Sequence, residues 1–264
     1  MQQLNEQELR AAIVEIGRNV WQKGWVASND GNISCRLDES RVLCTPTGIS
    51  KGMMAVDDLI ICDMVGNKVA GKRERTSEFN MHLTIYKLRP DVTAIVHAHP
   101  PGATGFAVAG RAMNQALLPE VIVTLGCVPL AEYGLPGTPA LTDGMIPLIP
   151  KYDAILMGNH GAVCYGADLW KAYFKMETVE HTARITLIAE MLGGPKVLPR
   201  LEVDKLLDSR ARYGITSKAG FEDGCPLAAD ESSCGVAEPR YEFTRAELLA
   251  LVREALRMRG VDAN

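Results

Sequence analysis

The sequence lacks the features of a membrane protein, a secreted protein or a nucleic-acid-binding protein. No apolar run approaches the roughly 18 residues that a membrane-spanning helix needs. The formal net charge of -4 provides no basic surface for nucleic acid or for an anionic membrane. Residues 1–8 contain no basic region followed by an apolar stretch, as a signal peptide would. We therefore expect a cytoplasmic protein that binds neither nucleic acid nor membranes.

The cysteines form neither an evident disulfide framework nor a thiolate metal site. The seven are Cys35, Cys44, Cys62, Cys127, Cys164, Cys225 and Cys234. They are scattered and odd in number, and most lie in apolar runs, which is typical of buried free thiols in a reducing cytoplasm. No C-x-x-C pair occurs, so a metal site would use other ligands.

The length of 264 residues allows one large domain or two small ones, with 47% hydrophobic residues to build a core. Periodicity predicts helices at residues 6–24, 77–87, 103–109, 142–149, 168–192 and 244–258. Apolar runs predict strands at residues 33–37, 41–45, 59–64, 92–99, 153–157 and 162–165. A polar, irregular stretch from 195 to 241 predicts an arm or lid. This mixture favours an α/β fold with one mixed sheet covered by helices on its faces.

Three of the five histidines stand where a divalent metal ion could bind them. His97 and His99 end a predicted strand, and residues two apart in a strand point to the same face. His160 follows the predicted strand at 153–157. A lone H-x-H pair is usually a chance arrangement, but a third histidine at the end of a second strand favours metal binding. Three nitrogen ligands and one open position are typical of catalytic zinc.

Glu78 is the candidate base beside this predicted site. It stands at the start of the predicted helix at 77–87, with Thr76 or Ser77 as the expected N-cap. The helix leads directly into the strand that carries His97, so a carboxylate here could be a metal ligand, a proton carrier, or both in turn. The alternative is that Glu78 only complements the helix dipole.

Small polar residues and glycines at turns suggest an anion site. Gly31-Asn32, Thr47-Gly48 and Thr76-Ser77 could supply backbone N–H groups and hydroxyls to a phosphate. Lys51 could add positive charge near the phosphate or lie in a solvated turn. His82, four residues after Glu78, is interpreted as a packing residue rather than a supporting residue of the site, and Glu177 and His181 as a structural hydrogen-bonding pair.

Taken together, these motifs resemble the class II aldolase/adducin family, and within it the L-fuculose-phosphate aldolases. The resemblance covers roughly residues 5–195, in order and with similar spacing. Its main motifs are Asn29–Ser34, Thr45–Gly48, Ser77-Glu78, His97-Ala-His99-Pro100 and Asn159-His160-Gly161.

The resemblance implies a three-layer αβα fold with a central mixed, mostly antiparallel sheet. Residues 1–195 would form the catalytic domain, and residues 196–264 a C-terminal arm and helix packed on the same domain or on a neighbouring subunit. A homotetramer is implied.

The resemblance also implies a set of site residues. Zinc, or another divalent ion such as Mn2+, Co2+ or Fe2+, would be bound by His97, His99 and His160. Glu78 would ligate the metal in the empty site and act as acid/base on substrate. The phosphate of the substrate would be held by Asn32, Thr47, Gly48, Thr76 and Ser77.

The implied reaction is metal-dependent aldol cleavage of a ketose 1-phosphate, in carbohydrate metabolism, giving dihydroxyacetone phosphate and an aldehyde. One alternative is a metal-dependent decarboxylase of an aromatic or sugar-derived acid, so the substrate is a small phosphorylated sugar or a carboxylic acid. Another is a pentulose-phosphate 4-epimerase, although those enzymes tend to carry Asp at the position of Glu78. A non-catalytic, adducin-like module is disfavoured because all three histidines are present.

The chain departs from the aldolase pattern in the residue that handles the aldehyde. The family has a tyrosine acid after the H-x-H strand, but residues 116–121 contain none. Glu120 or Tyr133 could substitute for it. The C-terminal part is longer than in the family, and Tyr213 and Tyr241 are the tyrosines that it could supply. The aldehyde half of the substrate therefore stays open.

Overall fold

The computed structural model describes residues 4–215. Its helices are α1 (Glu6–Gln22), α2 (Phe79–Leu88), α3 (Pro101–Val108), α4 (Pro119–Thr124), α5 (Pro139–Asp143), α6 (Leu169–Met191) and α7 (Arg200–Ser209), with 3-10 turns at Val56–Asp58 and Arg210–Tyr213. Its strands are β1 (Asn32–Arg36), β2 (Arg41–Cys44), β3 (Ile60–Asp63), β4 (Lys68–Ala70), β5 (Ala94–Ala98), β6 (Leu130–Ala131), β7 (Ala154–Met157) and β8 (Gly161–Gly166). None of the helices in this part of the chain combines the length and the apolar composition of a membrane span.

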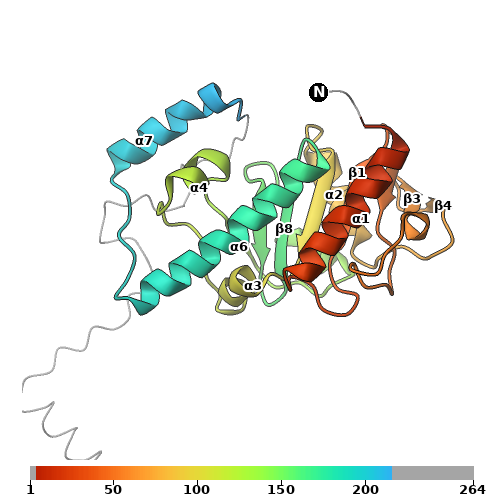
Figure 1. Cartoon of the computed structure of the whole chain (residues 1–264), viewed down its shortest axis with the longest axis horizontal. Helices are drawn as coiled ribbons and strands as arrows, with labels where there is room; N and C mark the ends of the chain where they lie inside the picture. The colour runs from red at the N-terminus through yellow and green to blue at the C-terminus, as the bar shows by residue number, and fades with distance from the viewer. Residues whose placement is uncertain (1–3, 216–264) are drawn as a thin grey trace, which may run out of the picture. The chain divides into compact units, whose positions relative to one another are not determined.

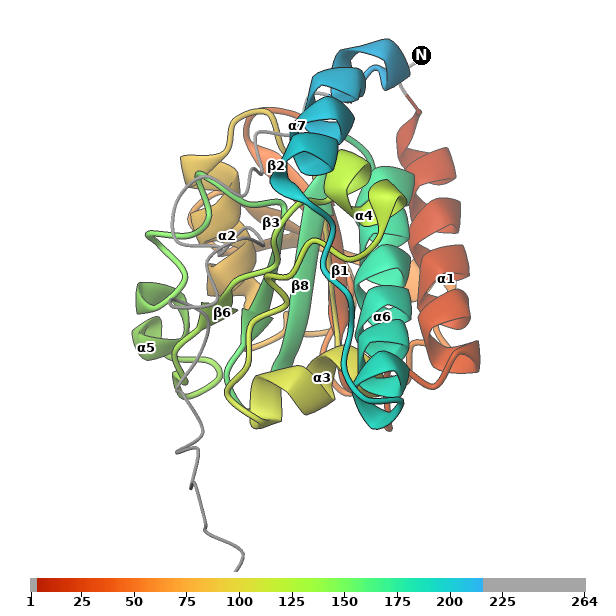
Figure 2. The same ribbon diagram turned by 90° about the vertical axis from the view of Figure 1, so that its left-hand side faces the viewer.

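The strands form one sheet in the order β4-β3-β2-β1-β5-β8-β7-β6. Every neighbouring pair is antiparallel except β6 and β7, which are parallel. One core cluster joins one face of the sheet to α1, α3, α4 and α6, and a second joins the other face to α2 and α5. Figure 2 shows the two helical layers on either side of the sheet. The predicted three-layer αβα fold with a mixed, mostly antiparallel sheet is confirmed.

Local sequence explains where the first helix begins and what it buries. Asn5 caps α1 by accepting a hydrogen bond from the Glu8 amide, and the Glu8 side chain bonds back to the Asn5 amide. This reciprocal pair satisfies two amides that the helix leaves without partners. The apolar stripe of Ile13, Ile16 and Val20 is buried against the sheet.

Two predicted elements differ from the structure. The helix expected at 142–149 is wrong, because α5 covers Pro139–Asp143 and the chain then continues in turns. Met145 and Ile149 nevertheless reach the core from these turns, so their helical spacing reflects burial without a helix. The stretch expected to be irregular after residue 195 contains α7, and the helix expected at 244–258 lies outside the described residues.

Helix α7 packs against α4 on the same chain (Figure 1). Val203 is fully buried in a third, smaller core cluster with Ile122 of α4. Beyond the helix, the Arg210 guanidinium donates hydrogen bonds to the carbonyl oxygens of Ile122 and Val123. Arg210 therefore satisfies carbonyl groups at the end of a short helix.

The cysteine prediction is partly confirmed. Cys35, Cys44, Cys62 and Cys164 are buried free thiols, as expected. Cys127 is disulfide-bonded, so the prediction that its thiol is free is wrong. The remaining two cysteines, Cys225 and Cys234, lie outside the described residues.

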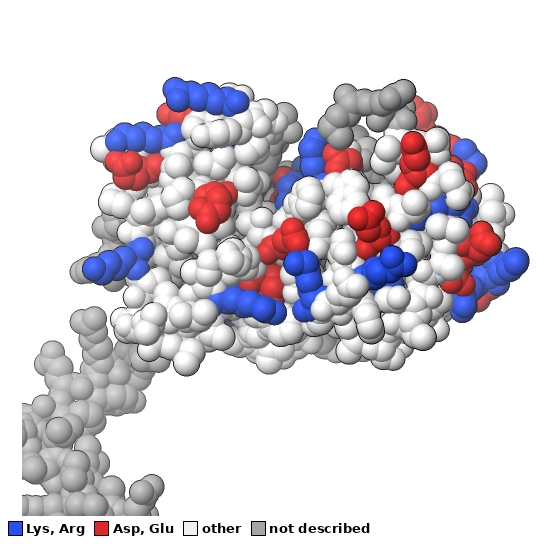
Figure 3. Space-filling model, viewed as in Figure 1, with Lys and Arg blue, Asp and Glu red and all other residues white. Residues whose placement is uncertain are grey.

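Charged side chains of both signs are interspersed on the face shown in Figure 3. Several form ion pairs within or between neighbouring elements, such as Arg10 with Glu6 and Lys23 with Glu177. The visible face thus offers no continuous surface of one charge.

Candidate metal centre

The three histidines of the two motifs converge at one end of the central strands. His97 lies in β5, His99 directly follows that strand, and His160 lies in the turn between β7 and β8. Their ring centroids are 4.9 to 5.0 Å apart in every pairing, and one nitrogen of each ring lies within 4.8 Å of the others. This is a compact triangle from three separate segments of the chain.

The geometry of this triangle fits a tetrahedral ion. The Nε2 atoms of His97 and His99 are 3.2 Å apart. Two nitrogens at zinc-ligand distance in a tetrahedron would be separated by about 3.3 Å. The three histidines therefore could hold one divalent ion and leave a position for a further ligand.

A hydrogen bond orients the ring of His97, and a carboxylate lies near the ring of His99. His97 donates from Nδ1 to the carbonyl oxygen of Ala162 at 2.9 Å, which leaves the lone pair on Nε2 directed at the site. His99 Nδ1 lies 3.5 Å from a carboxylate oxygen of Asp30. His160 Nδ1 is buried and has no hydrogen-bond partner among residues 4–215, while its Nε2 faces the site. All three rings thus present a nitrogen to the same point.

The Asn159-His160-Gly161 motif has a steric explanation. Asn159 has a φ of 53°, in the left-handed region that asparagine tolerates better than most residues. A Cβ atom at Gly161 would lie 2.6 Å from Cδ2 of His99 and 2.7 Å from the Ala98 carbonyl oxygen. Only glycine lets β8 begin this close to the imidazoles.

We therefore expect Gly161→Ala to displace the His99 ring and to weaken metal binding by about 10- to 100-fold. Loss of a group that orients a metal ligand typically has an effect of this size. Metal titration of the purified variant, followed by calorimetry, would measure this. The matched control is Gly105→Ala in α3, where an added Cβ meets nothing within 4 Å. Equal metal affinity in the two variants would contradict the steric explanation.

The Glu78 carboxylate lies beside two corners of this triangle. Its Oε1 lies 3.1 Å from His160 Nε2, and its Oε2 lies 3.3 Å from His97 Nε2. Glu78 itself is the N-cap residue of α2, so the expected cap at Thr76 or Ser77 is wrong, and its side chain makes no capping hydrogen bond. The carboxylate is directed at the histidines instead of the helix end.

Electrostatics couple Glu78 to His97. Burial raises the pKa of Glu78, but the charge of His97 and hydrogen bonds from His160 and His97 outweigh burial and hold that pKa well below its usual range. Burial lowers the pKa of His97, but the Glu78 carboxylate raises it above its ordinary value. Burial, with its neighbours His97 and His160, lowers the pKa of His99 to about 3. A metal cation at this site would compete with the proton on His97.

The predicted anion-binding segments meet beside Glu78. Thr47 donates its backbone N–H to the Glu74 carbonyl at 2.9 Å, and Pro46 pairs with Arg75, so the turn at Thr47-Gly48 lies against the chain leading to Thr76-Ser77. Thr76 Oγ1 accepts a hydrogen bond from the Glu78 amide. Thr47, Gly48 and Ser77 are exposed.

Asn32, the fifth predicted anion-binding residue, is placed differently. Its side chain is buried, and its Nδ2 donates to Glu78 Oε2 at 2.7 Å. Its Oδ1 lies 2.5 Å from His82 Nε2. The Asn32 amide thus contacts the candidate acid/base directly. The interpretation of His82 as a packing residue misses this contact.

Lys51 is buried, so the interpretation that it lies in a solvated turn is wrong. Only 2% of the residue is exposed, and its Nζ donates hydrogen bonds to the carbonyl oxygens of Asn29 and Ile49. These carbonyls belong to the turns that precede β1 and follow Gly48. The buried Lys51 side chain therefore links two of the predicted anion-binding turns through hydrogen bonds.

Burial lowers the pKa of Lys51 from 10.5 to about 8, so its charge destabilises the fold below pH 8. Between pH 8 and 10.5 the unfolded state binds more protons, and stability from this group rises with pH. We expect wild type to gain about 3 kcal/mol relative to Lys51→Met across this window, since a tenfold change in proton affinity is about 1.4 kcal/mol. Chemical denaturation of both proteins would measure the difference between their free energies of unfolding at each pH. Cysteine and tyrosine titrations are common to both proteins and drop out of this difference. A difference in stability between wild type and Lys51→Met that does not change with pH would contradict this argument.

Among the candidate replacements for the missing tyrosine, Tyr133 lies in a loop beside the site. A Cβ at Gly158, two residues before His160, would lie 3.1 Å from the Tyr133 amide nitrogen. At the other end of this loop, a Cβ at Gly137 would lie 3.2 Å from Cβ of Ser77. Tyr133 is 60% exposed. Glu120 is exposed on α4, Tyr213 is exposed after α7, and Tyr241 lies outside the described residues.

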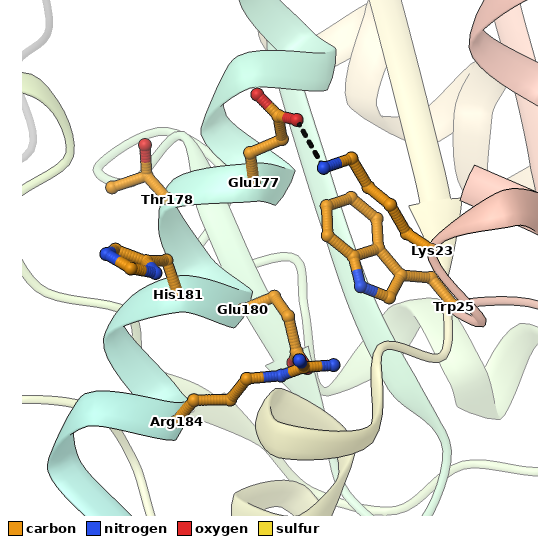
Figure 4. Close-up of a pocket in the computed structure, with 7 residues that line it drawn as sticks. All are labelled: Lys23, Trp25, Glu177, Thr178, Glu180, His181 and Arg184. Carbon is orange, nitrogen blue, oxygen red and sulfur yellow. Dashed lines mark hydrogen bonds and ion pairs between the residues drawn. The ribbon is translucent and has the colours of Figure 1, made fainter. Parts of the chain in front are cut away.

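Other polar residues of α6 line a pocket on that helix (Figure 4). Glu177 accepts from the Tyr173 hydroxyl and pairs with Lys23, so the expected hydrogen bond with His181 is wrong. Glu180 is buried and accepts from the amides of Gly102 and Ala103, at the start of α3. It therefore anchors the turn that follows His99, a role with no sequence signal.

Comparisons with known proteins show the family of this chain and the likeness of its fold to solved structures. The family model described as Class II Aldolase and Adducin N-terminal domain matches residues 11–187. A 3-oxo-tetronate 4-phosphate decarboxylase of Haemophilus influenzae is 34% identical over 70% of this chain and 88% of its own length. An L-fuculose phosphate aldolase of Methanocaldococcus jannaschii is 33% identical over 66% of this chain and 93% of its own. A solved L-fuculose 1-phosphate aldolase has a TM-score of 0.71 and 29% identity, covering 76% of this chain and 95% of that one.

Proposed function

Because this chain belongs to the class II aldolase and adducin family, we propose that it is a metal-dependent lyase for a phosphorylated sugar. We propose specifically an aldolase that cleaves a ketose 1-phosphate into dihydroxyacetone phosphate and an aldehyde. The observation that carries this proposal is the contact of the Glu78 carboxylate with both His97 and His160. That contact sets an ionised acid/base at the open side of a three-histidine site.

The donor set fits a divalent ion with catalytic chemistry. Three neutral imidazoles suit zinc, and also manganese, cobalt or iron, and affinity order does not decide which ion a cell supplies. A metal ion held by His97, His99 and His160 would stabilise negative charge on the substrate's carbonyl oxygen.

Glu78 would move the proton of the reaction. Its lowered pKa keeps it ionised, so it can take a proton from the hydroxymethyl carbon of dihydroxyacetone phosphate in the condensation direction. In the cleavage direction the C4 hydroxyl loses its proton to Glu78 as the C3–C4 bond breaks and the aldehyde forms, and Glu78 then gives this proton to the enediolate carbon. We propose that Thr47, Gly48, Thr76 and Ser77 hold the phosphate, because their turns meet beside Glu78. Asn32 would orient Glu78.

A second candidate is decarboxylation of a phosphorylated 3-oxo sugar acid. The absence of a tyrosine at residues 116–121 favours it, because carbon dioxide leaves without a proton transfer on the departing group. Relatives named 3-oxo-tetronate 4-phosphate decarboxylase are 33% and 34% identical to this chain. Loss of the carboxylate from such an acid leaves the same enediolate of dihydroxyacetone phosphate. Both reactions would therefore use Glu78 in the same way.

Deuterium exchange tests the shared step. Zinc-loaded protein in heavy water should exchange the hydroxymethyl hydrogen of dihydroxyacetone phosphate, detected by NMR, and a chelated sample should not. Aldehyde release from L-fuculose 1-phosphate would then indicate the aldolase, and carbon dioxide release from 3-oxo-tetronate 4-phosphate the decarboxylase. No exchange with metal bound would refute the enediolate chemistry proposed for both.

We also propose a cytoplasmic homotetramer that acts in carbohydrate metabolism. Exposed apolar side chains at the end of α6 support self-association: Leu187, Ile188, Met191 and Leu192 are 50 to 82% exposed. Contiguous apolar surface of this kind marks interaction sites in soluble proteins. Light scattering would give the number of chains, and a monomer in solution would contradict the proposal.

A further inference from the structure

A row of buried polar groups runs from Glu78 into the protein. Asn32 bonds to Glu78 and His82, Ser34 Oγ lies 2.6 Å from His82 Nδ1, and Tyr86 Oη lies 2.8 Å from Ser34 Oγ. Asn32, Ser34, His82 and Tyr86 are each at most 3% exposed. We call these five residues the Glu78 network.

The fold itself aligns the network. Asn32 and Ser34 are two apart in β1 and share one face of the sheet. Glu78, His82 and Tyr86 are spaced by four residues, so they lie one above another on α2. Asn32 is also the register partner of His97 across β1 and β5. The network therefore links the helix, the strand and the candidate metal site.

Chemistry fixes the direction of every hydrogen bond in the network. The Nδ2 of Asn32 can only donate and its Oδ1 can only accept, so His82 must carry a hydrogen on Nε2. Burial and the charge of His97 lower the pKa of His82 to about 3, which leaves the ring neutral with Nδ1 as an acceptor. Ser34 then donates to His82, and Tyr86 donates to Ser34. Each group donates to the next, ending on the carboxylate.

A flipped Asn32 amide would break this order. Its oxygen would then lie 2.7 Å from a carboxylate oxygen with no hydrogen between them. The hydrogen on His82 Nε2 would meet an NH2 group that cannot accept it. His82 thus dictates which end of the amide faces Glu78.

We propose that His82 is a positioning residue that holds Glu78 in its reactive orientation through Asn32. This inference rests on the proposed role of Glu78 as acid/base. The network does not conduct protons, because the Asn32 amide would have to accept a proton at Oδ1 and release another from Nδ2, which would convert it to the unstable imidic acid tautomer. Its contribution is therefore orientation, the role of the groups that support ligands in metal sites.

Substitution of His82 tests the inference in the zinc-loaded protein. His82→Met removes the donor to Asn32 at similar volume, and should lower kcat by about 10- to 100-fold with KM and metal content nearly unchanged. His82→Gln restores an N–H near the position of Nε2 and should recover most of kcat. The control Tyr165→Phe removes another buried hydroxyl, bonded to the Tyr152 carbonyl, and should reduce stability but leave kcat unchanged.

A second measurement does not depend on turnover. Neutron diffraction of the wild-type crystal should find the His82 hydrogen on Nε2 and the Asn32 NH2 directed at Glu78. A hydrogen on Nδ1, or a flipped amide, would overturn the inference even if His82→Met fails to fold.

The outcomes separate this inference from the proposed function. If His82→Met keeps full kcat while Glu78→Gln is inactive, His82 has no positioning role and the function stands. If Glu78→Gln is itself fully active, the proposed function fails. Equal loss of kcat in His82→Met and His82→Gln would also overturn the inference, because the restored donor would have had no effect.

Discussion

Glu78→Gln should lower kcat by about 100- to 10,000-fold, the usual contribution of a general acid/base. Glutamine has the same shape, and its carbonyl oxygen can still accept the hydrogen bond from Asn32 Nδ2. What it lacks is the ability to take up and return a proton at this position. Because substrate binding is assigned to other groups, KM should change little. Steady-state kinetics with the preferred substrate, and deuterium exchange into dihydroxyacetone phosphate, would measure both effects.

Metal content distinguishes lost chemistry from a lost site in this variant. The Glu78 carboxylate raises the pKa of His97. Removing its charge lowers the affinity of His97 for the proton that competes with a metal ion. The variant should therefore keep close to the metal content of wild type. The matched control is Glu177→Gln, which removes a carboxylate paired with Lys23 on α6. If Glu78→Gln retained wild-type exchange and kcat, another group would have to carry the proton.

Strand periodicity predicts that His97 and His99 point to the same side of the sheet, because alternation of side chains is a local property of the backbone, and the two rings do lie together. The contact of both with His160 depends on the antiparallel pairing of β5 with β8 and on the left-handed turn at Asn159. The family spacing indicated this contact. The close approach that requires Gly161 becomes visible only when the His99 ring is in place.

The role of Asn32 could not be read from its motif. Sequence pattern groups it with the phosphate-binding turns, whereas the register of β1 against β5 sets it opposite His97 and beside Glu78. Helical spacing alone favours a packing role for His82, because it shows the helix face that the residue occupies and not the strand residue that it contacts. Such contacts join residues about 50 positions apart, where local patterns carry no information.

Local patterns also fail to predict the secondary structure where buried residues with helical spacing lie in turns, or where a helix buries little of its surface. Met145 and Ile149 have helical spacing and are buried, but they reach the core from successive turns after α5. Conversely, α7 is a short helix with one fully buried residue, Val203, in a polar stretch. Val203 packs in a small cluster with Ile122 of α4 and with Tyr152, and few apolar residues of the helix are needed to form it.

His97→Ala should abolish both metal binding and activity. Removing one of three histidines should weaken metal affinity by more than about 100-fold, beyond the 10- to 100-fold cost of losing a group that only orients a ligand. The Ala162 carbonyl also loses its donor, which costs about 1–3 kcal/mol of stability because the group is buried. Elemental analysis after gel filtration, together with deuterium exchange, would record the loss of the ion and of the chemistry.

A variant that only unfolds would imitate this result, so His99→Ala is the decisive companion. The His99 side chain is 26% exposed, whereas that of His97 is fully buried, so its removal should leave the fold intact. Both variants should lose metal, while only His97→Ala should lose much thermal stability. The exposed His181 on α6 supplies the control, since His181→Ala should keep both metal and turnover. If His99→Ala folded, kept its metal ion and remained active, the ion would have to be held elsewhere, and the three-histidine centre would be wrong.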